Sequence, residues 1–354
     1  MNPALFLADL EAKPAALRAL AARLTDEDPW AFLGTAPHPG TTHPDTQHPG
    51  TAPHPGTAAH PGTASPGTAA YPGTPRRVTF VGMGSSRYAA LVAARRLRFH
   101  GIDAVAEYAS DAPPPVDGLL VAISASGTSV ETLDAMAGRS YVAVTNNPDS
   151  PLARSATAVV EMHAGAESGG VACRSFQHTQ LLLDALIRRL SDQDLLPTVR
   201  LIERTAAATE DLLERRDTWL PRVSDVLADG DGVWPIAPVD RISSALQSAL
   251  MFREGPRQAA DGCETGDWAH VDVYLTKTLR YRALLFPGSR YDEQALDWMR
   301  ERKSTYVSVG DDVAGAAETV RFRHDDDAGV RLTTETLIAE LVAAKWWSEI
   351  HRNG

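Results

Sequence analysis

The sequence predicts an α/β protein built from two doubly wound, flavodoxin-like parallel sheets in tandem. Short apolar runs at 78–81 and 118–123 are each followed by a glycine- and serine-rich turn and then a helical pattern. Such runs are typical of strands buried on both faces of a parallel sheet. Further short apolar runs, read as strands, occur in the second half at 232–236, 284–289 and 306–310. The chain of 354 residues is long enough for two such units.

Composition and charge exclude several classes of protein. Apolar residues make up 44% and charged residues 22%, so a wholly disordered chain is excluded. The net charge of −11 argues against a nucleic-acid partner, which needs a basic surface. No apolar stretch is long enough to span a membrane, and acidic residues stand where a signal peptide carries basic ones. Cys173 and Cys263 match neither a disulfide framework nor a metal spacing. We therefore expect a cytoplasmic protein without metal or cofactor.

The chain divides into five segments. Residues 1–34 form a helical segment, with one helix predicted over 4–24. Residues 35–76 repeat His-Pro-Gly and related phrases, which predicts a disordered linker, with weak metal binding by its histidines as the alternative. The first lobe spans 77–195, connecting helices span 196–229, and the second lobe spans 230–354.

The first candidate binding loop follows the strand at 78–81. It reads Gly82-Met83-Gly84-Ser85-Ser86 and opens a helix that runs to about residue 99. The free amides and serine hydroxyls at a helix start attract anions, phosphate above all. A tight connection without function is the alternative for this loop taken alone.

The second candidate loop strengthens the phosphate interpretation. Ser124, Ser126, Thr128 and Ser129 surround Gly127 at the start of the next helix. These neutral donors suit a phosphomonoester that must be released after turnover. The loop lacks the Gly-Lys-Ser/Thr of a Walker motif, and Arg87 stands where a dinucleotide fingerprint needs its third glycine. Both loops follow strands, so a doubly wound sheet brings them to one edge.

The pair GMGSS and SASGTS resembles the sugar isomerase (SIS) fold, and in particular the isomerase half of glutamine–fructose-6-phosphate aminotransferase. The resemblance covers residues 77–190 and includes the segment 164–172, which is similar to the family's Ala-Gly-Pro-Glu-x-Gly-Val-Ala. It implies that Ser85, Ser86, Ser124, Ser126 and Ser129 contact the phosphate of a phosphorylated hexose or aminosugar. Ala125 replaces the glutamine that is usual in the family.

The second half resembles the family less closely. The helix at 243–254 is similar to the family helix whose last glutamate transfers a proton, which assigns that role to Glu254; a solvated glutamate at a helix end is the alternative. The segment 263–270 resembles the family's Gly-Glu-x-x-His-Gly-Pro, whose histidine assists ring opening from a neighbouring subunit. His270 takes that place only with a local insertion, and a packed loop histidine is the alternative. A metal site at Glu264, Asp267 and His270 fits no standard spacing. The strand at 232–236 lacks a glycine loop, so the second lobe is expected to be degenerate.

Departures from the aminotransferase narrow the expected activity. The family's amino-terminal cysteine nucleophile and its Leu-Ala-Lys-Ser tail have no counterpart, and Met251 stands where the family helix has a lysine. Lys303 and Lys345 lie in charged helical contexts, which suggest solvated faces. We therefore do not expect glutamine-dependent amination. An aldose–ketose or aminosugar-phosphate isomerase, or a deaminase-isomerase, is expected; a sensor that binds the sugar phosphate without turnover is the alternative. Because the family builds its sites between subunits, a homodimer is expected.

Overall fold

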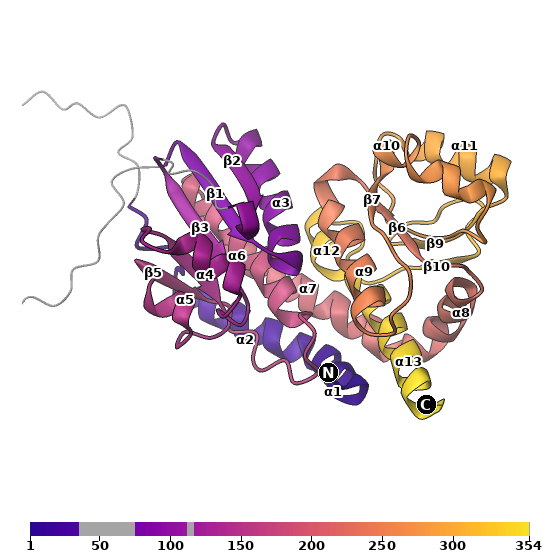
Figure 1. The fold of residues 1–354 in the computed structure, drawn as a ribbon, viewed down its shortest axis with the longest axis horizontal. Helices are drawn as coiled ribbons and strands as arrows, with labels where there is room; N and C mark the ends of the chain where they lie inside the picture. Colours follow the sequence, from indigo (N-terminus) through magenta and orange to yellow (C-terminus); the bar gives the residue numbers. More distant parts are fainter. Residues whose placement is uncertain (35–74, 112–116, 354) are drawn as a thin grey trace, which may run out of the picture.

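The computed structural model describes residues 1–34, 75–111 and 117–353. Most of the predicted linker at 35–76 therefore lies outside the described residues. Figure 1 shows two lobes side by side, each with a twisted sheet flanked by helices. Among the described residues no helix is both long and apolar enough to cross a membrane.

The first sheet contains five parallel strands in the order β2-β1-β3-β4-β5. This is the flavodoxin-like order that the sequence predicts. The central strands are almost wholly buried, because helices cover both faces. The strands are β1 (Arg77–Gly82), β2 (Asp103–Tyr108), β3 (Leu119–Ile123), β4 (Val142–Thr145) and β5 (Ala158–Glu161).

Helices α3 to α6 belong to the first lobe. Nearly all side chains of α6 are buried, because it packs against the sheet, against the connecting helix α7 and against the second lobe. The helices are α3 (Gly84–Phe99), α4 (Val130–Met136), α5 (Pro151–Arg154) and α6 (Arg174–Leu190), with a short 3-10 turn η1 (Ala109–Asp111).

The second sheet repeats the first, in the order β10-β9-β8-β6-β7 and again wholly parallel. With β6 in the place of β1 and β8 in the place of β3, this is the same topology, so the predicted tandem is confirmed. The elements are β6 (Trp234–Ala237), η2 (Val239–Arg241), α9 (Ile242–Glu254), β7 (Cys263–Glu264), α10 (Thr265–Trp268), η3 (Asp272–Lys277), β8 (Arg282–Leu285), α11 (Asp292–Arg302), β9 (Thr305–Val309), β10 (Glu318–Val320), α12 (Ala328–Thr334) and α13 (Thr336–Asn353).

One predicted helix is divided in the structure. The helix expected at 4–24 is two helices, α1 (Pro3–Glu11) and α2 (Lys13–Asp26). The connecting helices expected at 196–229 are α7 (Leu196–Glu214) and α8 (Arg216–Ala228). The two amino-terminal helices serve different lobes, because α2 packs on α7 beside the first core whereas α1 packs on α13 in the second.

Candidate phosphosugar site

The two serine loops meet at the switch point of the first sheet. Strands β1 and β3 are neighbours, and the connections from their carboxyl ends turn to opposite sides of the sheet, which is where such folds place ligands. Gly82 at the end of β1 pairs with Ile123 at the end of β3. A Cβ atom on Gly82 would lie 3.1 Å from the Ile123 carbonyl oxygen and 3.1 Å from the Ser86 Cβ. A side chain here would crowd both neighbours, so glycine favours the close approach of the two loops.

The first loop presents the start of α3 to this crevice. Gly84 adopts a φ of +49°, which turns the chain from the strand into the helix. Met83 at the N-cap offers no side-chain cap. The Ser86 amide donates to the Met83 carbonyl at 3.2 Å, so the amides of Gly84 and Ser85 are the ones available to a ligand. Ser85 and Ser86 lie in this first turn, half-buried.

The second loop contains hydroxyls with two different roles. Buried Ser124 accepts a hydrogen bond from the Gly127 amide at 3.2 Å, so it shapes the turn. Ser126 and Thr128 are exposed, and their hydroxyl oxygens lie 2.8 Å apart. Ser129 is the N-cap of α4 and donates to Glu131 at 2.9 Å. The hydroxyls of Ser126 and Thr128 are therefore the ones most open to a ligand from solvent.

The loop after β4 is hydrogen-bonded to the second loop and holds it in place. The Thr145 hydroxyl donates to the Ala125 carbonyl at 3.2 Å, and the Asn146 amide donates to the same oxygen at 3.0 Å. The Asn146 side chain accepts from the Ala164 amide at 2.9 Å and donates to the Gly165 carbonyl at 2.7 Å. These bonds join three successive strand ends into one rigid edge.

A positively charged side chain, Arg87, also lies at this edge, and no role in binding was expected for it from the sequence. The Arg87 guanidinium lies 3.7 Å from the centre of the Tyr108 ring. Tyr108 ends β2 and pairs with Gly82, so Arg87 stands beside the first loop. Its position in the first turn of α3, next to the glycine loop, was the sequence signal that could have found it.

Glu254 is the last residue of α9, as the family resemblance requires. Burial raises its pKa above the ordinary value of a glutamate, against the opposing charges of Arg253 and Arg257. Among the described residues, no hydrogen bond or ion pair joins Glu254 to the serine loops. Its part in catalysis stays a prediction.

His270 lies in the second lobe, directly after α10. It is exposed, and its amide donates to the Asp267 carbonyl at 2.8 Å. Glu264 caps α10 by accepting from the Gly266 and Asp267 amides, at 2.8 Å and 3.0 Å. Within the described segments, no group of three or more His, Cys, Asp or Glu side chains is arranged to hold a metal ion.

The second sheet has its own switch point, between β6 and β8, but an arginine occupies it. The buried Arg241 side chain donates to the carbonyl oxygens of Phe286 and Pro287, which follow β8. Its Nε also lies 3.2 Å from buried Glu335. A guanidinium therefore stands in the second lobe where the first has its glycine loop, which agrees with the expected degeneration.

Comparison with known proteins identifies the class. Residues 74–189 match the model of the SIS domain, so the chain contains a SIS domain, in the lobe with the two serine loops. The chain is homologous to the isomerase domain of glutamine–fructose-6-phosphate aminotransferase. The aminotransferase of Zymomonas mobilis is 28% identical over 247 residues, which cover 65% of this chain and 40% of that protein. The chain thus spans about two fifths of the length of this relative.

Solved structures share the fold. The C-terminal domain of glucosamine-fructose-6-phosphate aminotransferase from Francisella tularensis has a TM-score of 0.65 at 18% identity, covering 77% of this chain and 85% of that one. Tagatose-6-phosphate ketose/aldose isomerase from Escherichia coli has a TM-score of 0.62 at 16% identity, covering 78% and 82%. At these identities the likeness establishes the architecture.

Proposed function

We propose that this protein binds a phosphorylated hexose or aminosugar at the β1/β3 crevice and isomerises it between aldose and ketose forms. The observation that carries the proposal is the meeting of two hydroxyl-rich loops with a free helix start at the switch point of the first sheet. Helix amides and neutral hydroxyls bind a phosphate without the tight hold of an arginine clamp. Arg87 adds positive charge beside the first loop.

The arrangement of the two lobes supports Glu254 as the base. Helices α3 and α9 pack against each other and hold equivalent places in the two repeats. Arg95 and Arg96, near the end of α3, line the same cavity as Asp240 and Arg241, which precede α9. The proposal is that α9, which contacts α3, runs back along it and directs Glu254 toward the start of α3, where Ser85 and Ser86 lie. A raised pKa also suits a carboxylate that takes up and returns a proton near neutral pH.

Ring opening would fall to His270 of a second subunit. An exposed histidine without a contact to its own serine loops is compatible with such a role. The proposal therefore includes a homodimer. Light scattering should give a mass of about twice the 38.0 kDa of the chain, and a monomer at micromolar concentration would contradict it.

A sensor that binds the same sugar phosphate without turnover is the second candidate. The arginine at the second switch point supports it, because Arg241 stands there in place of a glycine loop like the one in the first lobe. Incubation with fructose 6-phosphate and with glucosamine 6-phosphate, followed by NMR, separates the two candidates. Binding without interconversion would favour the sensor.

Variants of three residues test the site itself. Ser126→Ala removes an exposed hydroxyl, so we expect the dissociation constant of the sugar phosphate to rise about tenfold to a hundredfold, as for a lost hydrogen bond to a charged group. Ser140→Ala is the matched control, because the Ser140 hydroxyl precedes β4 at the opposite edge of the sheet and bonds Thr157. Glu254→Gln should leave affinity nearly unchanged while abolishing turnover. Wild-type affinity in Ser126→Ala would show that the site lies elsewhere.

A further inference from the structure

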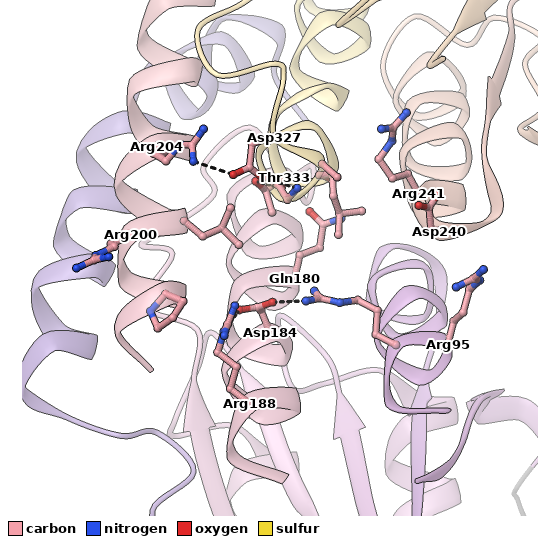
Figure 2. A pocket seen from close by; sticks show the side chains of 16 residues that line it. Arg95, Gln180, Asp184, Arg188, Arg200, Arg204, Asp240, Arg241, Asp327 and Thr333 are labelled. Atoms are coloured by element: carbon pink, nitrogen blue, oxygen red, sulfur yellow. Dashed lines mark hydrogen bonds and ion pairs between the residues drawn. The ribbon is translucent and has the colours of Figure 1, made fainter. Parts of the chain in front are cut away.

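A cavity of about 610 Å³ opens between the two lobes. It lies at the carboxyl-terminal end of α3, whereas the serine loops lie at the amino-terminal end. Its walls come from α3, α6 and α7 on one side and from η2 and α12 on the other (Figure 2). This volume is typical of a site for a small organic ligand.

The charge of the lining favours an anion. Six arginines and three aspartates line the cavity, which gives a formal charge of +3 in a chain whose net charge is −11. Part of this charge is compensated, because Asp184 pairs with Arg96 at 2.6 Å and with Arg188 at 3.1 Å. Arg204 pairs with Asp327 at 2.9 Å.

Two guanidinium groups of the lining have no carboxylate partner among the described residues. They are Arg95, which lies over the Phe99 ring at 4.5 Å, and exposed Arg200. Figure 2 shows them at opposite ends of the cavity, with Gln180 between them. Arginine prefers oxyanions because its planar fork matches carboxylate and phosphate oxygens.

Gln180 supplies an independent sign that the cavity accepts a ligand. Its side chain is buried, and its Nε2 donates to the Ser243 hydroxyl at 3.3 Å and to the Leu332 carbonyl at 3.2 Å. Its Oε1 has no hydrogen-bond partner within the part of the chain that the structure describes. Buried amide oxygens are normally satisfied, so this acceptor suits a hydroxyl or amino group of a ligand.

The cavity lies at a position in the fold where ligands are commonly bound. Asp240 and Arg241 belong to the turn after β6, at the switch edge of the second sheet, where doubly wound folds place their ligands. In the first lobe this edge presents hydroxyls, whereas in the second it presents guanidinium groups. The second lobe has therefore changed the chemistry of its binding edge.

We infer that this cavity is a second ligand site, for a small phosphorylated organic anion with at least two negative charges. The anion is held through Arg95 and Arg200, with the Gln180 amide oxygen accepting from its organic part. Because the walls come from both lobes, the bound ligand bridges them and favours the arrangement in which they are packed together.

Pyrophosphate is the probe, measured by isothermal titration calorimetry on the full chain. We expect one site that survives Ser126→Ala, because the serine loops lie at the other end of α3. Arg95→Gln and Arg200→Gln should each weaken binding about tenfold. Arg290→Gln, which removes the same charge from an exposed arginine stacked on Tyr291, should leave binding unchanged.

Three results would overturn the inference. Pyrophosphate binding that is absent from the wild type excludes the site. Binding that is lost in Ser126→Ala but kept in both arginine variants assigns the anion to the serine loops. An equal loss in Arg290→Gln shows a response to net charge alone. None of these outcomes affects the sugar-phosphate proposal, which is tested with its own ligands.

Discussion

Gly127 shows how much of the candidate site depends on a single backbone position. Its φ is +65°, and a Cβ atom there would lie 2.0 Å from the Ser150 Oγ and 2.3 Å from the Ser150 Cβ. Its carbonyl accepts the Leu152 amide at 3.2 Å, so the loop after β3 is fastened to the one after β4. Only glycine satisfies both the backbone angle and the close approach.

Gly127→Ala should therefore lower the free energy of unfolding by more than the strain of the backbone angle alone would. We expect about 1–2 kcal/mol for the left-handed φ and about 1–3 kcal/mol more for the clash with Ser150. Gly138→Ala is the matched control, because Gly138 has a φ of +72° but open space around its Cβ position. The free energy of unfolding in urea measures both variants. Equal losses would show that Ser150 simply moves aside.

At the scale of elements, a buried ion pair joins the amino-terminal helices to α13. Lys13, the first residue of α2, bonds Glu340 in α13, and both side chains are almost wholly buried. Burial raises the pKa of Glu340, and Lys13 opposes that rise. The pair therefore fixes where residues 1–34 lie against the second lobe.

Lys13→Met should destabilise the protein by about 3–5 kcal/mol, because it leaves Glu340 buried without a countercharge. Adding Glu340→Met should recover most of this loss, since a well-packed apolar pair replaces a buried ion pair at little cost. Arg18→Met is the control on the same helix: its exposed pair with Glu210 should contribute less than about 1 kcal/mol. A double variant as unstable as Lys13→Met would contradict the electrostatic explanation.

At the scale of the whole molecule, two buried titratable side chains in different lobes have opposite effects on the stability of the fold as the pH falls. Burial lowers the pKa of His178 in α6 to about 4, and its Nδ1 lies 2.8 Å from the Met162 carbonyl oxygen. Burial raises the pKa of Asp272 in η3 to about 6. Acidification from pH 6.5 to 4 therefore destabilises the fold through His178, because the unfolded chain binds that proton more readily. Between pH 6 and 4 it stabilises the fold through Asp272, whose folded form binds the proton first.

The free energy of unfolding of the wild type, minus that of His178→Gln, should consequently fall by about 3 kcal/mol between pH 7 and pH 4. For Asp272→Asn the same difference should change in the opposite direction, because the wild type becomes more stable relative to this variant as the pH falls. Urea titrations at a series of pH values measure both, and the two lobes must unfold in one transition for the comparison to hold. A pH-independent difference for His178→Gln would contradict this, because it would mean that the histidine binds its proton equally well in the folded and unfolded chains.

The strands that the sequence predicted best are those buried on both faces. Strands β1 and β3 are short apolar runs with a polar turn after them, and the pattern alone located them. Edge strands β2 and β5 are only partly buried, so their sequences carry no such run and sequence reasoning did not name them. The break between α1 and α2 was missed because no glycine marks the turn.

The sequence by itself determined the tandem topology, the two serine loops and the loss of the second glycine loop, because each follows from neighbouring residues and a strand-turn-helix rule. The cavity between the lobes, the burial of Arg241 beside Glu335 and the approach of α9 to α3 were decided only by the tertiary structure. Arg95, Gln180 and Arg200 are distant in sequence and unremarkable in their own segments. They acquire a common role only when the packing of two lobes brings their side chains around one space.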